Sequence, residues 1–115
     1  MMLADVQFDD GDSAVVARVR GEIDLSNAES VSRAIDETVP NHALAVVLDL
    51  SQVRYLDSAG IHLIYKLRER LRSRGQVLGL VDPDGCPARE ALRLSGVEHH
   101  VRMIGTVDQA LRELV

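Results

Sequence analysis

The chain has very few aromatic residues and a single cysteine. Among its 115 residues there is no tryptophan, one phenylalanine (Phe8) and two tyrosines, so the core must be aliphatic. Stacking on single-stranded bases needs aromatic platforms, which argues against that mode of nucleic-acid binding. The lone cysteine, Cys86, excludes an internal disulfide and a cysteine-clustered zinc site. Such sparing use of cysteine fits a reducing cytosol.

Long hydrophobic runs and net positive charge are also missing. The longest strongly apolar run, Ala43–Leu48, is far too short to cross a bilayer, and the first residues lack the basic and long apolar regions of a signal peptide. The formal net charge of -5 is opposite to what a general nucleic-acid binder needs. We therefore expect a soluble, cytoplasmic protein with no direct nucleic-acid contact and no membrane insertion.

Charge is unevenly distributed along the chain. Residues 1–40 are mainly acidic, whereas residues 66–74 contain five basic side chains and one acidic side chain, Glu69. Such a basic stretch has two interpretations. It can be the solvated face of a helix, or it can orient a charged protein partner.

The sequence predicts five strands separated by short turns. A turn at Asp9–Asp12 indicates that the first two strands form a hairpin. A continuous apolar run is typical of a central strand covered by helices, and this one is predicted to end at a loop, Asp49–Ser51. A turn at Asp82–Gly85 follows the fourth strand. The predicted strands are Leu3–Phe8, Ala14–Ile23 (breaking from Gly21 onward), Ala43–Leu48, Gln76–Val81 and Val101–Ile104.

Four helices are expected between and after these strands. Ser26–Glu29 and Thr106–Gln109 match the capping box that opens a helix. A longer helix is predicted from Ser58 to about Arg74, with Gly75 in the left-handed position after it. Its expected buried stripe is Ile61, Ile64, Leu67 and Leu71. Pro87 is placed as the first residue of a short helix that ends at Gly96.

The resulting order, ββαβαβαβα, predicts a single α/β domain. Strands that alternate with helices imply parallel pairing through right-handed crossovers, and the opening hairpin adds an antiparallel strand. We expect a mixed, mostly parallel sheet packed by helices.

Three motifs in this order resemble the STAS domain, specifically the stand-alone bacterial anti-sigma factor antagonists. The first is Val19-Arg20-Gly21-Glu22-Ile23-Asp24 before a helix. The second is Leu48-Asp49-Leu50-Ser51 followed by Tyr55-Leu56-Asp57-Ser58-Ala59-Gly60, and the third is Leu94-Ser95-Gly96-Val97. The likeness extends over essentially the whole chain, and implies one STAS domain over residues 1–115.

The resemblance implies a protein-binding switch. In that family the unmodified antagonist binds an anti-sigma factor that is an ATP-dependent serine kinase, and a sigma factor is released. The kinase phosphorylates a serine of the antagonist and ends the interaction, and a serine phosphatase resets it. Carried over to this chain, the serine is Ser58. The expected partner-binding residues are Glu22, Asp24, Ser26, Asp57, Ala59, Gly60 and His62.

Several of these residues have more than one interpretation. Ser58 can be simply the cap of its helix, or the phosphorylated residue, or both. Gly60 either leaves room for a kinase or packs against the sheet. Asp24 can cap the first helix or accept hydrogen bonds from a partner, and it is left available for the partner if Ser26 supplies the cap. His62 departs from the small residue often found there, and is either an ordinary exposed or packed histidine or a partner for phosphoserine.

Catalysis is not expected. The residues around Ser58 lack the first glycine of a Gly-x-Ser-x-Gly elbow, and no glycine-rich loop with a lysine is present for phosphate binding. We expect no catalytic residue, metal or cofactor. The alternative function is a binding-only STAS subunit of a stress-signalling scaffold or of a lipid-transport ATPase complex.

Overall fold

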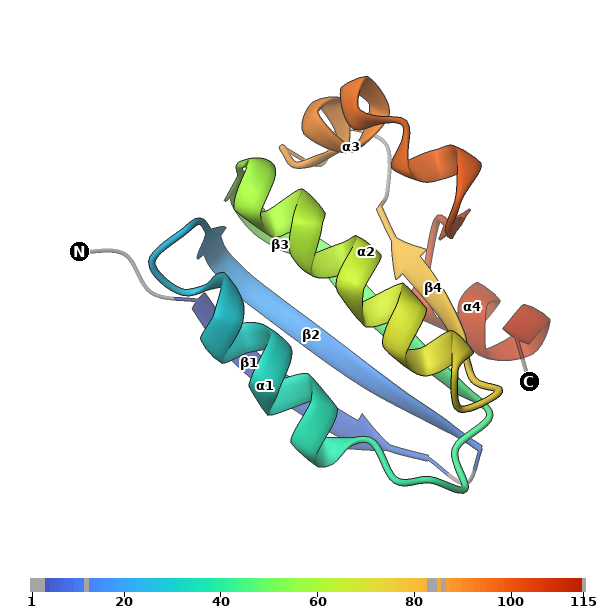
Figure 1. Cartoon of the computed structure of the whole chain (residues 1–115). Coiled ribbons are helices and arrows are strands. Elements are labelled where there is room, and N and C mark those ends of the chain that lie inside the picture. Colours follow the sequence, from blue (N-terminus) through green and yellow to red (C-terminus); the bar gives the residue numbers. More distant parts are fainter. Residues whose placement is uncertain (1–3, 12, 83–84, 86, 115) are drawn as a thin grey trace.

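An antiparallel hairpin opens the fold in the computed structural model, which describes residues 4–11, 13–82, 85 and 87–114 (Figure 1). Strand β1 (Ala4–Asp10) pairs with β2 (Ala14–Ile23), and Gly11 N donates to Ala14 O at 3.0 Å across the turn. The predicted strand start Leu3 and turn residue Asp12 lie outside the described residues. Asp9 was predicted in the turn but belongs to β1, where its carboxylate forms an ion pair with Arg18 on the neighbouring strand.

The sheet order is β1-β2-β3-β4-β5, so every strand pairs with its neighbour in the chain. The remaining strands are β3 (Ala45–Leu56), β4 (Val77–Val81) and β5 (Arg102–Ile104), and all three pairings after the hairpin are parallel. This confirms the predicted mixed, mostly parallel sheet.

The predicted loop at Asp49–Ser51 is wrong, because β3 continues through it. Leu50 and Val53 are fully buried and carry the strand onward. Asp49 is also largely buried, accepts a hydrogen bond from Ser51 N at 3.0 Å, and lies 3.8 Å from the guanidinium of Arg18 on β2. Because Arg18 on the neighbouring strand compensates the charge of Asp49, this polar segment can remain in the sheet.

Helices cover both faces of the sheet, and Figure 1 shows α1 and α2 side by side on one of them. Helices α1 (Ala28–Thr38) and α2 (Ser58–Arg72) share the larger core cluster with one set of strand residues. Helix α4 (Val107–Leu114) packs on the opposite face in a smaller cluster. A Cβ on Gly79 would lie 2.5 Å from Leu114 Cδ1, so glycine in β4 permits the close approach of α4.

The shortest helices lie near the C-terminal end of β4 (Figure 1). Helix α3 (Arg89–Ser95) is followed by Gly96, whose φ of 77° confirms the predicted helix stop, and by a 3₁₀ turn, Val97–His99. Pro87 was predicted to be the first helical residue, but the helix begins two residues later. The fourth strand's predicted turn includes Pro83 and Asp84, which, like Cys86, lie outside the described residues.

Two further helix predictions are corrected in detail. In α2 the buried positions include Leu63, whereas Ile61 is only partly buried; Gly75 after the helix has the predicted positive φ, 73°. Before α4, Thr106 Oγ1 accepts from Gln109 N at 3.1 Å, which is half of the predicted capping box. The Gln109 side chain bonds Glu113 instead of reaching back.

No helix in the described part of the chain is long and apolar enough to cross a membrane.

Candidate functional site

Ser58 is the first residue of α2, immediately after the turn that follows β3. The helix is capped by Asp57, whose Oδ1 accepts from Ala59 N at 2.8 Å and from Gly60 N at 3.2 Å. The interpretation of Ser58 as the cap is therefore wrong. Its side chain is exposed and makes no hydrogen bond with any described residue. The Ser58 hydroxyl is consequently free of a structural task and open to solvent.

The turn before α1 is built on Asn27. Its Nδ2 donates to Glu22 O at 2.8 Å, and its Oδ1 accepts from Asp24 N at 3.1 Å, so this side chain ties the turn back to the end of β2. Sequence reasoning missed Asn27, although asparagine is the residue type that builds such local turns. The helix itself begins at Ala28, and no side chain caps it.

The predicted capping box at Ser26–Glu29 is wrong, because both of its side chains have other partners. Ser26 donates to Asp24 Oδ1 from both its hydroxyl, at 2.5 Å, and its backbone amide, at 2.9 Å. Glu29 pairs with Arg33 one turn later, at 3.6 Å. Because Ser26 is turned toward Asp24, it cannot bond the first amides of α1.

Asp24 is therefore engaged locally rather than left available. The hydrogen bond from the Ser26 hydroxyl is the main cause that lowers the pKa of Asp24; partial burial acts in the opposite direction, and the backbone amide of Ser26 lowers the pKa further. The carboxylate stays ionised at neutral pH. The turn thus presents a fixed negative charge beside the end of β2.

The two turns lie at the same edge of the sheet. Asp57 N donates to Ile23 O at 3.3 Å, and Glu22 is paired in register with Tyr55. The predicted break in β2 is a local irregularity of the β2–β3 register next to Gly21, which has a φ of 101°, rather than an end of the strand. Such a bulge re-aims the residues that follow it toward the start of α2.

Gly60 serves packing at this junction. A Cβ there would lie 2.2 Å from Leu56 Cδ1 and 3.2 Å from Ile23 Cγ2. Glycine therefore lets the first turn of α2 rest directly on the ends of β2 and β3. Of the two interpretations of Gly60, the structure supports packing against the sheet.

A groove of about 790 Å³ runs between α1 and α2 with Ser58 at one end. Of the predicted site residues, Asp57, Ser58, Ala59 and His62 line it, whereas Glu22, Asp24, Ser26 and Gly60 do not. Leu25 also lines the groove and is 84% exposed, so it is an exposed apolar side chain of the same groove that sequence reasoning missed. The signal for it was a leucine in a polar turn. We call this part of the surface the Ser58 end of the groove.

His62 lines the groove from α2. His62 is exposed one helical turn after Ser58, and its pairing with a phosphate stays a prediction. Within the described part of the chain, no three His, Cys, Asp or Glu side chains are grouped so that they could hold a metal ion.

Comparison with known proteins identifies the family. The sequence model of the STAS domain matches residues 4–110. The chain is 31% identical over 102 residues to the anti-sigma-F factor antagonist RsfB of Mycobacterium tuberculosis, which covers 89% of this chain and 82% of RsfB.

Solved structures of anti-sigma factor antagonists have the same fold as this chain. An anti-sigma factor antagonist from Mycobacterium paratuberculosis is 28% identical, with a TM-score of 0.86 over 97% of this chain and 94% of that one. Unphosphorylated SpoIIAA, an anti-sigma factor antagonist, shares the fold at 19% identity, with a TM-score of 0.75 over 93% of each chain. The chain belongs to the STAS domain family.

Proposed function

We propose that this protein is an anti-sigma factor antagonist switched off by phosphorylation of Ser58. In its unphosphorylated form it binds an anti-sigma factor that is a serine kinase, and so releases a sigma factor; it acts by binding and not as an enzyme. The observation that carries the proposal is the exposed Ser58 hydroxyl, which has no structural task and lies at one end of a groove. The family membership and the antagonist relatives support the general role.

The local electrostatics favour a switch at this position. A phosphoryl group would add roughly -1.5 to -2 charges at neutral pH. A helix N-terminus usually compensates such a group through its free amides, but Asp57 already occupies those of Ala59 and Gly60. The carboxylate of Asp57 and that of Asp24, which is held ionised, would repel the phosphate. The new charge therefore stays exposed to a partner.

The energetic consequence falls on the complex rather than on the fold. Burying an uncompensated charge against a partner costs several kcal/mol, and about 1.4 kcal/mol already changes affinity tenfold. Because the Ser58 hydroxyl has no hydrogen bond within the domain, modifying it breaks none. We expect a small change in the free energy of unfolding and a loss of affinity of about a hundredfold or more.

The proposed contact surface combines the predicted residues with one that the structure adds. Asp57, Ala59 and His62 line the groove with Ser58, and Leu25 offers an apolar contact next to them. The turn formed by Glu22, Asp24 and Ser26 contributes from the neighbouring strand end. Gly60 acts through shape, because it sets how closely α2 approaches the sheet. We further propose that a serine phosphatase resets the switch, and that it works in the cytoplasm, where ATP is available to the kinase.

Intact-mass spectrometry tests the proposal. The protein is incubated with ATP and candidate anti-sigma kinases from its own organism, beside Ser58→Ala and the control Ser30→Ala, which removes another exposed hydroxyl from the first turn of α1, outside the groove and the proposed contact surface. We expect one phosphoryl gain in the wild type and in Ser30→Ala, none in Ser58→Ala, and loss of kinase binding after modification. No gain with any candidate, together with binding to a transporter or scaffold component, would instead support the binding-only alternative.

A further inference from the structure

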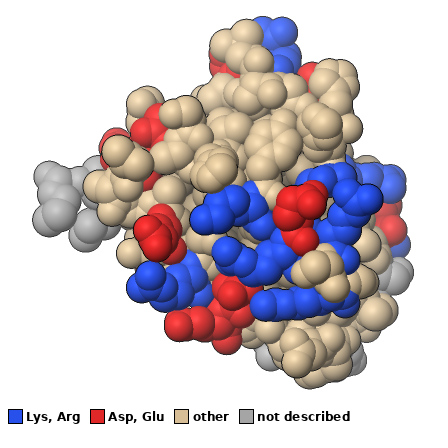
Figure 2. Space-filling view, in the orientation of Figure 1, with Lys and Arg blue, Asp and Glu red and all other residues tan. Residues whose placement is uncertain are grey.

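The groove between α1 and α2 continues well beyond Ser58, and its far half is basic. Lys66 and Arg70 line it from α2, and Arg74 follows just after that helix. Ser58, His62, Lys66, Arg70 and Arg74 succeed one another at intervals of four residues, so they form one slanted row along α2 and into the turn after it. Figure 2 shows Lys and Arg gathered over the C-terminal half of α2, whereas the area around its start carries almost none. We call Lys66, Arg70 and Arg74 the basic row.

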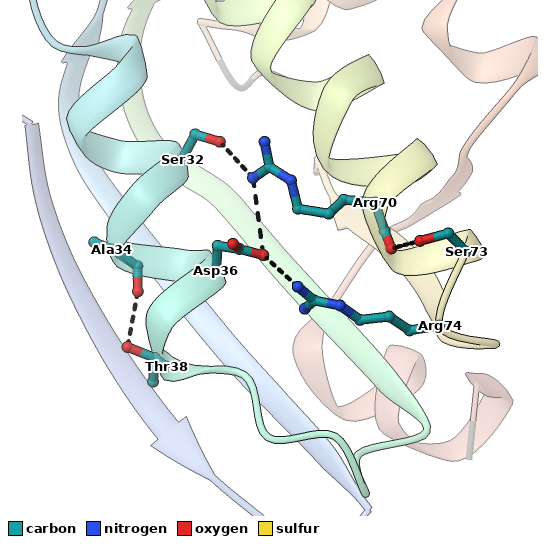
Figure 3. Close-up of polar contacts among 7 residues, drawn as sticks. All are labelled: Ser32, Ala34, Asp36, Thr38, Arg70, Ser73 and Arg74. Carbon is teal, nitrogen blue, oxygen red and sulfur yellow. Dashed lines mark hydrogen bonds and ion pairs between the residues drawn. The ribbon is translucent and has the colours of Figure 1, made fainter.

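The basic row has fewer acidic partners than it has basic side chains. Asp36 of α1 lies 3.2 Å from Arg74 Nη2 and 3.8 Å from Arg70 Nη1 (Figure 3). Arg70 also donates to Ser32 Oγ at 3.4 Å. Two guanidinium groups therefore share one carboxylate across the groove, and one positive charge is left over.

Lys66 adds a second uncompensated charge. Its side chain is exposed, lines the groove, and forms no ion pair or hydrogen bond with any described residue. The other charged pair of the lining, Glu29 and Arg33, neutralises itself within α1. Three cations thus face one carboxylate in this half, while the Ser58 end carries the carboxylate of Asp57. The groove is polarised along its length.

Helix stability explains only part of this pattern. Basic residues in the last turn interact favourably with the helix dipole, which accounts for Arg70 and Arg72. That effect falls off within one turn, and Lys66 lies before it. The dipole gives no reason for an unpaired ammonium group inside the groove.

We propose that the basic row binds an acidic, carboxylate-rich peptide segment of the partner that also contacts Ser58. The identity of the partner rests on the proposed function. Guanidinium groups match carboxylates in bidentate geometry, and the chemistry selects a chain of closely spaced acidic residues. Because the groove is negative at the Ser58 end and positive at the other, such a partner binds in one direction. Charge complementarity of this kind sets register and association rate more than affinity.

The test uses an octaglutamate peptide as the probe and the full ¹⁵N-labelled chain as the receptor. In NMR titrations at low salt, we expect shifts of backbone amides around Lys66, Arg70 and Arg74 and on the facing turns of α1. Lys66→Glu should weaken binding at least about fivefold, in keeping with reversal of one partly screened surface charge. Lys66→Gln should give an intermediate loss.

Arg112→Glu is the matched control. Arg112 is an exposed cation of α4, on the opposite face of the sheet, and like Lys66 it forms no ion pair or hydrogen bond with any described residue. The variant makes the same change in net charge, and we expect octaglutamate binding within about twofold of wild type. Dispersed amide spectra of both variants verify that the chains are folded.

Three results would overturn the inference: no binding at millimolar peptide, equal weakening by Arg112→Glu, or shifts spread over both faces of the sheet. An eight-nucleotide single-stranded DNA that binds the same row at least as tightly would make it a general polyanion site and also overturn the peptide assignment. The titration needs neither kinase nor phosphate. If octaglutamate binds the basic row but Ser58 is not phosphorylated, only the proposed function is refuted. If Ser58 is phosphorylated but octaglutamate does not bind the basic row, only this inference is refuted.

Discussion

Helices α1 and α2 both begin where a parallel strand ends, β2 for α1 and β3 for α2, yet their first turns are built differently. At α2, Asp57 accepts from two helix amides and leaves the next side chain, Ser58, unoccupied. At α1 the side chains bond backward into the turn, where Ser26 holds Asp24 and Asn27 holds Glu22 O. Only the start of α2 presents a serine hydroxyl without a local partner to the groove, and this difference separates a candidate switch from a structural turn.

The largest expected effect comes from adding a charge at each start. Ser58→Asp should weaken binding to the anti-sigma factor by about a hundredfold, because the new carboxylate enters the groove beside Asp57. Ser30→Asp adds the same charge in the first turn of α1, outside the groove and the proposed contact surface, and its effect should be at least about tenfold smaller. Isothermal titration calorimetry measures both. Equal losses would show that the two helix starts do not differ in the way proposed.

The packing of the α2 start gives the next effect. Gly60→Ala should lower the free energy of unfolding by about 1–3 kcal/mol, because its Cβ would overlap Leu56 and crowd Ile23. Gly105→Ala is the control, since a Cβ there meets only Gln109 Oε1 at 3.7 Å. Urea denaturation compares the two. A Gly60→Ala protein as stable as wild type, with weaker partner binding, would restore the clearance interpretation of Gly60.

Removing the acidic side chain at each helix start should have a smaller effect on the free energy of unfolding. Asp57→Ala should cost about 1 kcal/mol of unfolding free energy, the usual value for a lost helix cap. Glu29→Ala should change it by less than about 0.5 kcal/mol, because the carboxylate of Glu29 lies in an exposed pair with Arg33 rather than in a capping box. Thermal and urea unfolding both report this. A loss of about 1 kcal/mol in Glu29→Ala would mean that the capping box forms in solution.

The smallest effect is a pH dependence at the α1 start. The pKa of Asp24 is lower in the folded chain than in the unfolded chain, chiefly through the Ser26 hydroxyl. Its contribution to stability is therefore complete above the ordinary carboxyl pKa of about 3.9, and is lost as pH falls through the lowered value. Ser26→Ala should move the pKa of Asp24 back upward in a carboxyl NMR titration. An unchanged pKa would exclude the hydroxyl as its cause.

Element order and sheet type were predictable because they depend on local patterns. Alternation in Ala14–Ile23 and the apolar run at 43–48 each select a strand, and Gly75 and Gly96 mark helix ends by their positive φ. The Ser58 position at the start of a helix was predictable from the motif around it. Polar strand residues such as Asp49 were not, because the compensating Arg18 is distant in the chain and adjacent only across the sheet.

The groove was beyond sequence reasoning for a related reason. Asp57 is a good capping residue, so its role could have been found from its place before the helix. The opposition of Asp36 to Arg70 and Arg74, by contrast, requires α1 and α2 to lie side by side, and no local pattern specifies that. The Ser26–Glu29 spacing was misleading because a nearer acceptor, Asp24, competes for the same hydroxyl.

The agreement between sheet order and chain order has a consequence for synthesis. Each strand pairs with the one made just before it, so no strand waits for a distant segment. Each parallel pairing still has to close a crossover connection, so it should form more slowly than the opening hairpin. On the ribosome the hairpin can form first and the sheet can grow one strand at a time as the chain emerges. The edge that carries Ser58 is then assembled once β3 and α2 have been made, before the last two strands exist.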